Sequence, residues 1–219
     1  MRVYCHYCKA VFSNCYIVGE EPSVSNEPSV SNEPGGSGEP ADAIIIDPGV
    51  MDLNILNYIE DNNYSVKGIF ITHDHPFLLN GLATLLRIYD AEIFAINPSV
   101  NDMRSTMVRD GETINVGSIS VEVISVPGHS ADSAVYKIGS ILFTGDSLTA
   151  GLIGKTINSY STITQVSALR SKILSLPGDY AIFPGNGPPT SLGAERRFNL
   201  GIATFEALKP RRKNFRVNL

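Results

Sequence analysis

The chain has 219 residues, 43% of them apolar, and a formal net charge of -5. This length favours one domain with a sizeable core, spanning residues 1–219, and the acidic balance argues against a general nucleic-acid or membrane-surface binder. No apolar run reaches the roughly 18 residues that a membrane-spanning helix needs. Since the start shows no secretion-signal pattern, we expect a cytoplasmic protein. The basic cluster within 209–216 is short, which is typical of a solvated tail.

The first predicted elements are two strands within Arg2–Gly19, a stretch rich in Val, Tyr, Phe and Ile. They contain Cys5-His6-Tyr7-Cys8, which has the spacing of a zinc half-site. No second Cys or His pair follows at finger-like distance, and residues three apart on a strand face opposite ways. We therefore expect Cys5 and Cys8 to serve packing rather than metal or redox chemistry.

The composition changes at residues 20–41, where the sequence Glu-Pro-Ser-Val-Ser-Asn occurs twice and a Gly/Ser/Pro stretch follows. Such a segment cannot bury enough apolar surface to offset the entropy lost on ordering, so we expect a flexible loop. It separates two apolar strands, Tyr16–Val18 and Ala43–Ile46, that would otherwise form a hairpin. We interpret it as a low-complexity insertion inside a single domain.

Beyond the insertion, predicted helices and strands alternate. Apolar residues at helical spacing predict helices at 51–61, 77–89, 163–176 and 194–208. Short apolar runs predict strands at 66–72, 91–96, 114–116, 119–126, 134–138, 141–144 and 181–183. A β-rich chain with βα units in both halves suits two sheets packed face to face with helices outside, which is an α/β, four-layer αββα sandwich.

Four polar clusters each follow an apolar strand directly: Thr72–His75, Pro127–His129, Gly145–Asp146 and Pro184–Gly187. Loops at one edge of a sandwich can converge and carry ligands on a rigid base. Any single histidine there could be an ordinary core or loop residue. Three histidines with an Asp favour a metal site, because three imidazoles and a water form a known catalytic zinc arrangement.

Two carboxylates accompany these histidines. Asp146 could be a fourth ligand or could orient a water. Asp74 lies between His73 and His75. It could face solvent and cap backbone amides, or it could accept a hydrogen bond from an imidazole, and we do not count it as a ligand.

The order and spacing of these pieces resemble the metallo-β-lactamase superfamily, especially its short glyoxalase-II-like hydrolases. The resemblance runs through nearly the whole chain and rests on Asn14–Val18, Ile46–Gly49, Thr72–His75, Val126–Ser130, Phe143–Asp146, Phe183–Thr190 and Glu195–Asn199. It implies the αββα fold and a first metal position formed by His73, His75 and His129. Asp146 matches the family's bridging Asp.

The resemblance also implies a degenerate second metal position. The family signature His-x-His-x-Asp-His places its Asp on Phe77 and its third His on Leu78, and the family's final His falls on Asn186. Phe and Leu offer no lone pair, and Asn is a weak substitute for imidazole on a zinc-like metal. Leu78 also extends the apolar stripe of Leu82 and Leu85, so we expect apolar packing there.

This set of residues implies one divalent metal, most often zinc, with iron or manganese as alternatives. The first hypothesis is a mononuclear hydrolase, similar to hydroxyacylglutathione hydrolases, in which metal-bound hydroxide attacks a small thioester or ester and Asp146 orients the water or accepts a proton. The alternative is an impaired or inactive descendant that binds a ligand or partner, supported by the lost ligands and by an insertion near a loop that covers the active site in many relatives. Metal content discriminates between them, and the sequence does not indicate the oligomeric state.

Overall fold

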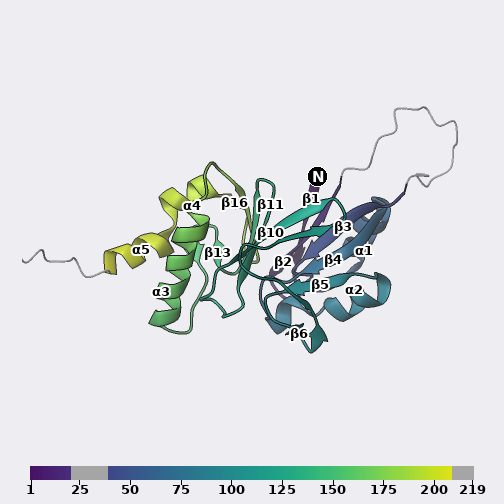
Figure 1. Ribbon diagram of the computed structural model, residues 1–219, viewed down its shortest axis with the longest axis horizontal. Helices are drawn as coiled ribbons and strands as arrows, with labels where there is room; N and C mark the ends of the chain where they lie inside the picture. Colours follow the sequence, from purple (N-terminus) through teal and green to yellow (C-terminus); the bar gives the residue numbers. More distant parts are fainter. Residues whose placement is uncertain (21–38, 209–219) are drawn as a thin grey trace, which may run out of the picture.

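The computed structural model describes residues 1–20 and 39–208 (Figure 1). Two six-stranded sheets form its centre, in the orders β1-β2-β3-β4-β5-β8 and β16-β15-β12-β11-β10-β9. The first sheet consists of β1 Arg2–Cys8, β2 Ser13–Gly19, β3 Ala41–Ile46, β4 Tyr64–Phe70, β5 Glu92–Ala95 and β8 Thr106–Met107. The second consists of β9 Thr113–Val116, β10 Ile119–Ser125, β11 Ala134–Ile138, β12 Ile141–Gly145, β15 Ala181–Pro184 and β16 Thr190–Ser191.

Helices and two short ribbons complete the described part of the chain. The helical segments are α1 Leu53–Asp61, the 3₁₀ turn η1 Pro76–Leu78, α2 Leu82–Ile88, α3 Ser159–Ala168 with its π-helical continuation η2 Leu169–Ile173, α4 Leu192–Phe198 and α5 Leu200–Leu208. The ribbons pair β6 Ser99–Val100 with β7 Met103–Arg104, and β13 Leu148–Thr149 with β14 Leu152–Ile153.

Three apolar clusters hold four layers together. The cluster between the two sheets takes Ile44 and Phe70 from the first sheet and Val121 and Phe143 from the second. A second cluster packs α1 and α2 on the outer face of the first sheet, and a third packs η2 and α4 on the outer face of the second. Figure 1 shows α1 and α2 on one side of the molecule and α3, α4 and α5 on the other. The predicted αββα sandwich is confirmed.

The hairpin predicted across the insertion is confirmed as well. Strands β2 and β3 pair antiparallel, with Tyr16 opposite Ile46 and Gly19 opposite Ala43. Residues 21–38 of the predicted insertion and the basic tail from 209 lie outside the described residues, so their predicted properties stay predictions. The two ends of the insertion meet at Glu20, whose amide donates to the Asp42 carbonyl at 3.2 Å.

The predicted helix at 77–89 is wrong in its first half. The chain forms only the short η1 turn, and a regular helix begins at Leu82. The interruption coincides with a close contact between Gly81 and the loop before α1: the Gly81 amide donates to the Gly49 carbonyl at 2.6 Å, and the Gly49 amide donates to the Leu78 carbonyl at 2.8 Å. These bonds replace helical ones. The two-residue strands β6, β7, β8, β13, β14 and β16 were not predicted, because two residues carry no periodicity.

Candidate metal centre

The four predicted ligands meet at one end of the sandwich. His73 and His75 follow β4, His129 follows β10, and Asp146 directly follows β12. One donor atom from each lies within 4.8 Å of the others. Nε2 of His73 is 2.8 Å from Nδ1 of His75, and Nε2 of His129 is 3.5 Å from that same Nδ1. Oδ2 of Asp146 is 3.8 Å from Nε2 of both His73 and His129.

This donor set fits a divalent metal. Two imidazole nitrogens bound at about 2.0 Å to a tetrahedral zinc lie roughly 3.3 Å apart, and the observed separations of 2.8 and 3.5 Å lie on either side of that value. Three imidazoles with one carboxylate suit zinc, and they also suit iron and manganese. The chain therefore has a His/Asp group suited to binding a divalent metal.

Two of the imidazoles are oriented through their other ring nitrogen. Nδ1 of His129 is 2.8 Å from the Lys155 carbonyl oxygen, which can only accept, so this nitrogen carries the proton and Nε2 keeps its lone pair. Nδ1 of His73 is 3.0 Å from the Thr72 hydroxyl, which donates to Asp47 Oδ2 at 2.7 Å. The Thr72 oxygen therefore accepts from His73, and Nε2 of His73 is also free to bind a metal.

Burial sets the charge of the innermost groups. His73 is 1% exposed, and its burial lowers its pKa to about 4, assisted by the neighbouring His75 and His129 and opposed by Asp146. It is therefore neutral at pH 7, as a metal ligand must be. Burial raises the pKa of Asp47 to about 7, although the backbone and side-chain hydrogen bonds from Thr72 lower it.

Glycines allow the strand ends to approach one another. Gly145 has φ of +49°, and a Cβ at this position would lie 2.4 Å from Thr72 Oγ1. A Cβ on Gly185 would lie 2.8 Å from Asp146 Oδ1. Any side chain at either position would push the Asp146 loop away from its neighbours.

The expected second metal position contains other contacts. Leu78 is 4% exposed and packs in the cluster beneath α1 and α2, as expected. The Asn186 amide Nδ2 donates to Asp146 Oδ1 at 2.9 Å. Phe77 lies in η1, but its side chain is outside the described atoms. Leu78 thus packs among apolar side chains, and Asn186 is hydrogen-bonded to an acidic one.

Sequence reasoning missed several residues that support the site. Asp47 and Asn14 were noticed as members of the segments that carry the family resemblance, but no role was predicted for either side chain. Asn14 Nδ2 donates to the carbonyls of Pro184 at 2.9 Å and Gly187 at 2.8 Å, which fixes the loop that carries Asn186. These bonds join residues about 170 positions apart, so no local pattern could reveal them.

Two further predicted positions are placed by the structure. Asp74 is exposed, and its backbone amide donates to Asp132 Oδ2 at 2.9 Å, which ties down the loop between His73 and His75. Cys5 is exposed and Cys8 is buried, on opposite faces of β1. His6 lies 2.8 Å from Asp52 Oδ2, at the start of α1.

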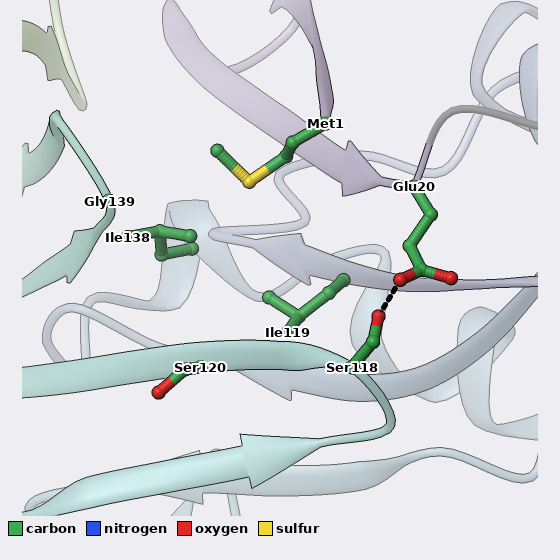
Figure 2. Close-up of a pocket in the computed structure, with 7 residues that line it drawn as sticks. All are labelled: Met1, Glu20, Ser118, Ile119, Ser120, Ile138 and Gly139. Atoms are coloured by element: carbon green, nitrogen blue, oxygen red, sulfur yellow. Dashed lines mark hydrogen bonds between the residues drawn. The ribbon is translucent and has the colours of Figure 1, made fainter.

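A separate pocket of about 390 Å³ lies at the other end of the sheets. Figure 2 shows its lining, which includes Met1, Glu20 and Ser118, with the Ser118 hydroxyl donating to Glu20. Its residues come from the strand ends opposite to those that carry the histidines. We assign no part of the metal chemistry to it.

Comparison with known proteins identifies the family. The family model described as the metallo-beta-lactamase superfamily matches residues 38–191, which is more than half of the chain. The chain belongs to the metallo-β-lactamase superfamily. Within the described residues, no helix is long and apolar enough to cross a membrane.

Three individual proteins are similar to this chain in sequence or in fold. An uncharacterised protein of Mycobacterium tuberculosis is 28% identical over 220 aligned residues, covering 85% of this chain and 91% of that protein. The hydroxyacylglutathione hydrolase of Idiomarina loihiensis is 30% identical over 141 residues, covering 64% of this chain and 54% of the enzyme. This chain thus matches about half the length of that enzyme. The crystal structure of ETHE1 from Myxococcus xanthus has a TM-score of 0.77 at 22% identity, covering 93% of this chain and 85% of that one.

Proposed function

We propose that this chain is a mononuclear metal-dependent hydrolase that acts on a small thioester or ester. The observation that carries the proposal is the convergence of three imidazole nitrogens and one carboxylate oxygen within 4.8 Å of one another. The cytoplasmic location and the single domain expected from the sequence stay predictions.

A divalent ion held there would polarise a carbonyl and lower the pKa of water to about 7. The chain's own residues supply the rest. The contacts at Lys155 and Thr72 would keep the lone pairs of His129 and His73 available to such an ion. Asp146 places Oδ2 3.8 Å from Nε2 of both histidines, where it can bind the ion or accept a proton.

The residues at the second position support a single ion. Leu78 packs into an apolar cluster, and Asn186 is engaged with Asp146. A second cation would stabilise charge on the substrate, and removing one such electrostatic element typically costs about 10²–10³ in rate. We therefore expect slow turnover compared with a two-metal relative.

The thioester or ester class rests on the relatives. Hydroxyacylglutathione hydrolases from Idiomarina loihiensis and other organisms match about 65% of this chain, and their name describes cleavage of an acyl–glutathione bond. Since the matched part is only about half of those enzymes, the recognition of glutathione itself is not part of the proposal.

Elemental analysis of the pure protein tests the proposal. We expect about one zinc, iron or manganese per chain, and turnover with at least one member of a thioester and ester panel. His129→Ala should lose most of the metal, because it removes one of three imidazoles. His6→Ala is the matched control, since His6 bonds Asp52 on another part of the molecule. Absence of metal from the native protein, or equal metal in both variants, would contradict the proposal.

A second candidate is a protein that binds a ligand or partner without catalysis. It is favoured by the Phe77, Leu78 and Asn186 substitutions at the family's second metal position. The same panel separates the two: one bound metal with no turnover on any thioester or ester would support this reading over the hydrolase.

A further inference from the structure

We propose that Asn186 is a positioning residue that orients the carboxylate of Asp146 toward the ion held by the three histidines. The inference rests on the proposed function, because it requires that an ion is bound there. It assigns a role to a residue that, from sequence alone, is only a lost ligand.

The carboxylate of Asp146 has its two oxygens in different surroundings. Oδ1 accepts from Asn186 Nδ2 at 2.9 Å. Oδ2 lies 3.8 Å from Nε2 of both His73 and His129. Because a carboxylate is planar, a donor that fixes Oδ1 also fixes the direction of Oδ2. The amide therefore holds Oδ2 toward the histidine nitrogens and prevents the carboxylate from rotating away.

The donor itself is held in place by the loop around it. Asn14 Nδ2 donates to the carbonyls of Pro184 and Gly187, on either side of Asn186. The Gly185 amide donates to the Gly145 carbonyl at 2.8 Å, directly beside Asp146. A side chain that only filled space would not need this backbone support, whereas a hydrogen-bond donor to a metal ligand does.

The chemistry of the amide also matters. An Asn amide donates a hydrogen bond without adding charge, and its Nδ2 has no lone pair available for a metal. It can therefore orient the carboxylate through one lone pair of Oδ1, and this nitrogen offers no ligand to a second cation. At this position the chain thus has a hydrogen-bond donor to Asp146 in place of a metal-binding imidazole.

Metal binding by the apoprotein tests the role directly. We would remove metal with a chelator and titrate Co²⁺, following its visible absorption, and measure the Zn²⁺ dissociation constant by competition. Outer partners of metal ligands contribute about 10–100-fold in affinity. We expect Asn186→Ala to weaken Zn²⁺ binding by at least about 10-fold and to change the Co²⁺ spectrum. Asn62→Ala removes the hydrogen bond that the Asn62 side-chain amide donates to the Tyr58 carbonyl at the end of α1. This variant should change neither the Zn²⁺ affinity nor the Co²⁺ spectrum.

A double-mutant cycle shows whether Asn186 acts through Asp146. If it does, Asn186→Ala should add no further loss of affinity in the Asp146→Ala background. An equal loss in both backgrounds would overturn the proposal, as would wild-type affinity and spectrum in Asn186→Ala. Circular dichroism checks the fold. If the Ala variant does not fold, Asn186→Ser replaces it, since its hydroxyl is one bond too short to reach Asp146.

These outcomes distinguish the two proposals. If the wild-type apoprotein binds no ion, the proposed function fails and this inference fails with it. If the wild type binds one ion and Asn186→Ala binds it equally well, only the positioning role is wrong.

Discussion

Thr72 connects a buried carboxylate to a metal-binding imidazole. Its amide and hydroxyl donate to Asp47, and its hydroxyl oxygen accepts from Nδ1 of His73. The direction of the hydroxyl proton therefore decides which nitrogen of His73 is protonated. While Asp47 is ionised, its oxygens accept hydrogen bonds and cannot donate them, so the Thr72 hydroxyl proton points to Asp47. The Thr72 oxygen then accepts from Nδ1 of His73, which leaves the ligating Nε2 unprotonated.

Asp47→Asn should reverse the direction of the hydrogen bonds from His73 through Thr72 to residue 47. The new amide can donate to the Thr72 oxygen, and the Thr72 hydroxyl would then donate to Nδ1 of His73, leaving the proton on Nε2. We expect about 10-fold or greater loss of Zn²⁺ affinity, measured by competition titration of the apoprotein. Thr72→Ser keeps the hydroxyl and should bind Zn²⁺ like the wild type. Unchanged affinity in Asp47→Asn would show that the tautomer of His73 is set elsewhere.

At the scale of single residues, the sequence predicted which side chains come together but not which hydrogen bonds orient them. His73, His75, His129 and Asp146 follow strands directly, so their convergence could be expected. The partners of their second atoms could not be expected. Whether Asn186 would point at Asp146 or at solvent depends on the backbone of its loop, and that backbone is fixed by Asn14 in a distant strand.

At the scale of elements, the segment between His75 and α2 has a conformation that the local sequence pattern did not predict. The apolar stripe of Leu78, Leu82 and Leu85 was correctly predicted to be buried. The prediction of one continuous helix failed because Gly81 packs against the backbone at Gly49 and Met51. Periodicity indicates which side chains face the core, but it does not reveal a contact between backbones.

Gly81→Ala should therefore destabilise the protein. Its φ is -81°, so the backbone conformation suits alanine, but the added Cβ would lie 2.6 Å from the Met51 nitrogen. Overpacking of this kind costs about 1–3 kcal/mol, to be measured by urea unfolding of the apoprotein. Thr84→Ala, at an exposed position of α2, should change stability by less than about 0.5 kcal/mol. If Gly81→Ala were as stable as the wild type, the backbone segments at Gly81 and Met51 would be able to move apart easily.

At the scale of the whole molecule, the two ends of the sandwich carry different parts of the chain. The histidines and Asp146 lie at one end, beyond β4, β10 and β12. The predicted insertion begins and ends at the other, where Glu20 and Ala41 lie near the start of β4. From the sequence, the insertion was expected near a loop that covers the active site in many relatives; residues 21–38 lie outside the described part of the chain, so this stays a prediction. The succession of strands and helices along the chain could be predicted from sequence pattern, but the order of the strands within each sheet required the structure.

Replacing residues 21–38 with a short Gly-Ser turn should leave metal binding intact. Gly19 and Ala43 are already paired across β2 and β3, and paired strands lie about 5 Å apart, so a few residues suffice to join them. Metal content by elemental analysis and the melting temperature should both match those of the full chain. A variant that folds but loses its metal would show that the segment contributes to the site.

The β2–β3 hairpin also offers a practical attachment point. The six residues of β3 separate its start from the end of the sandwich that carries the histidines, which corresponds to about 20 Å of extended strand. A fluorescent reporter or a surface tether that replaces residues 21–38 would be attached at the end of the sandwich opposite to the histidines. Immobilised molecules would then present their histidine clusters to solution in a common orientation.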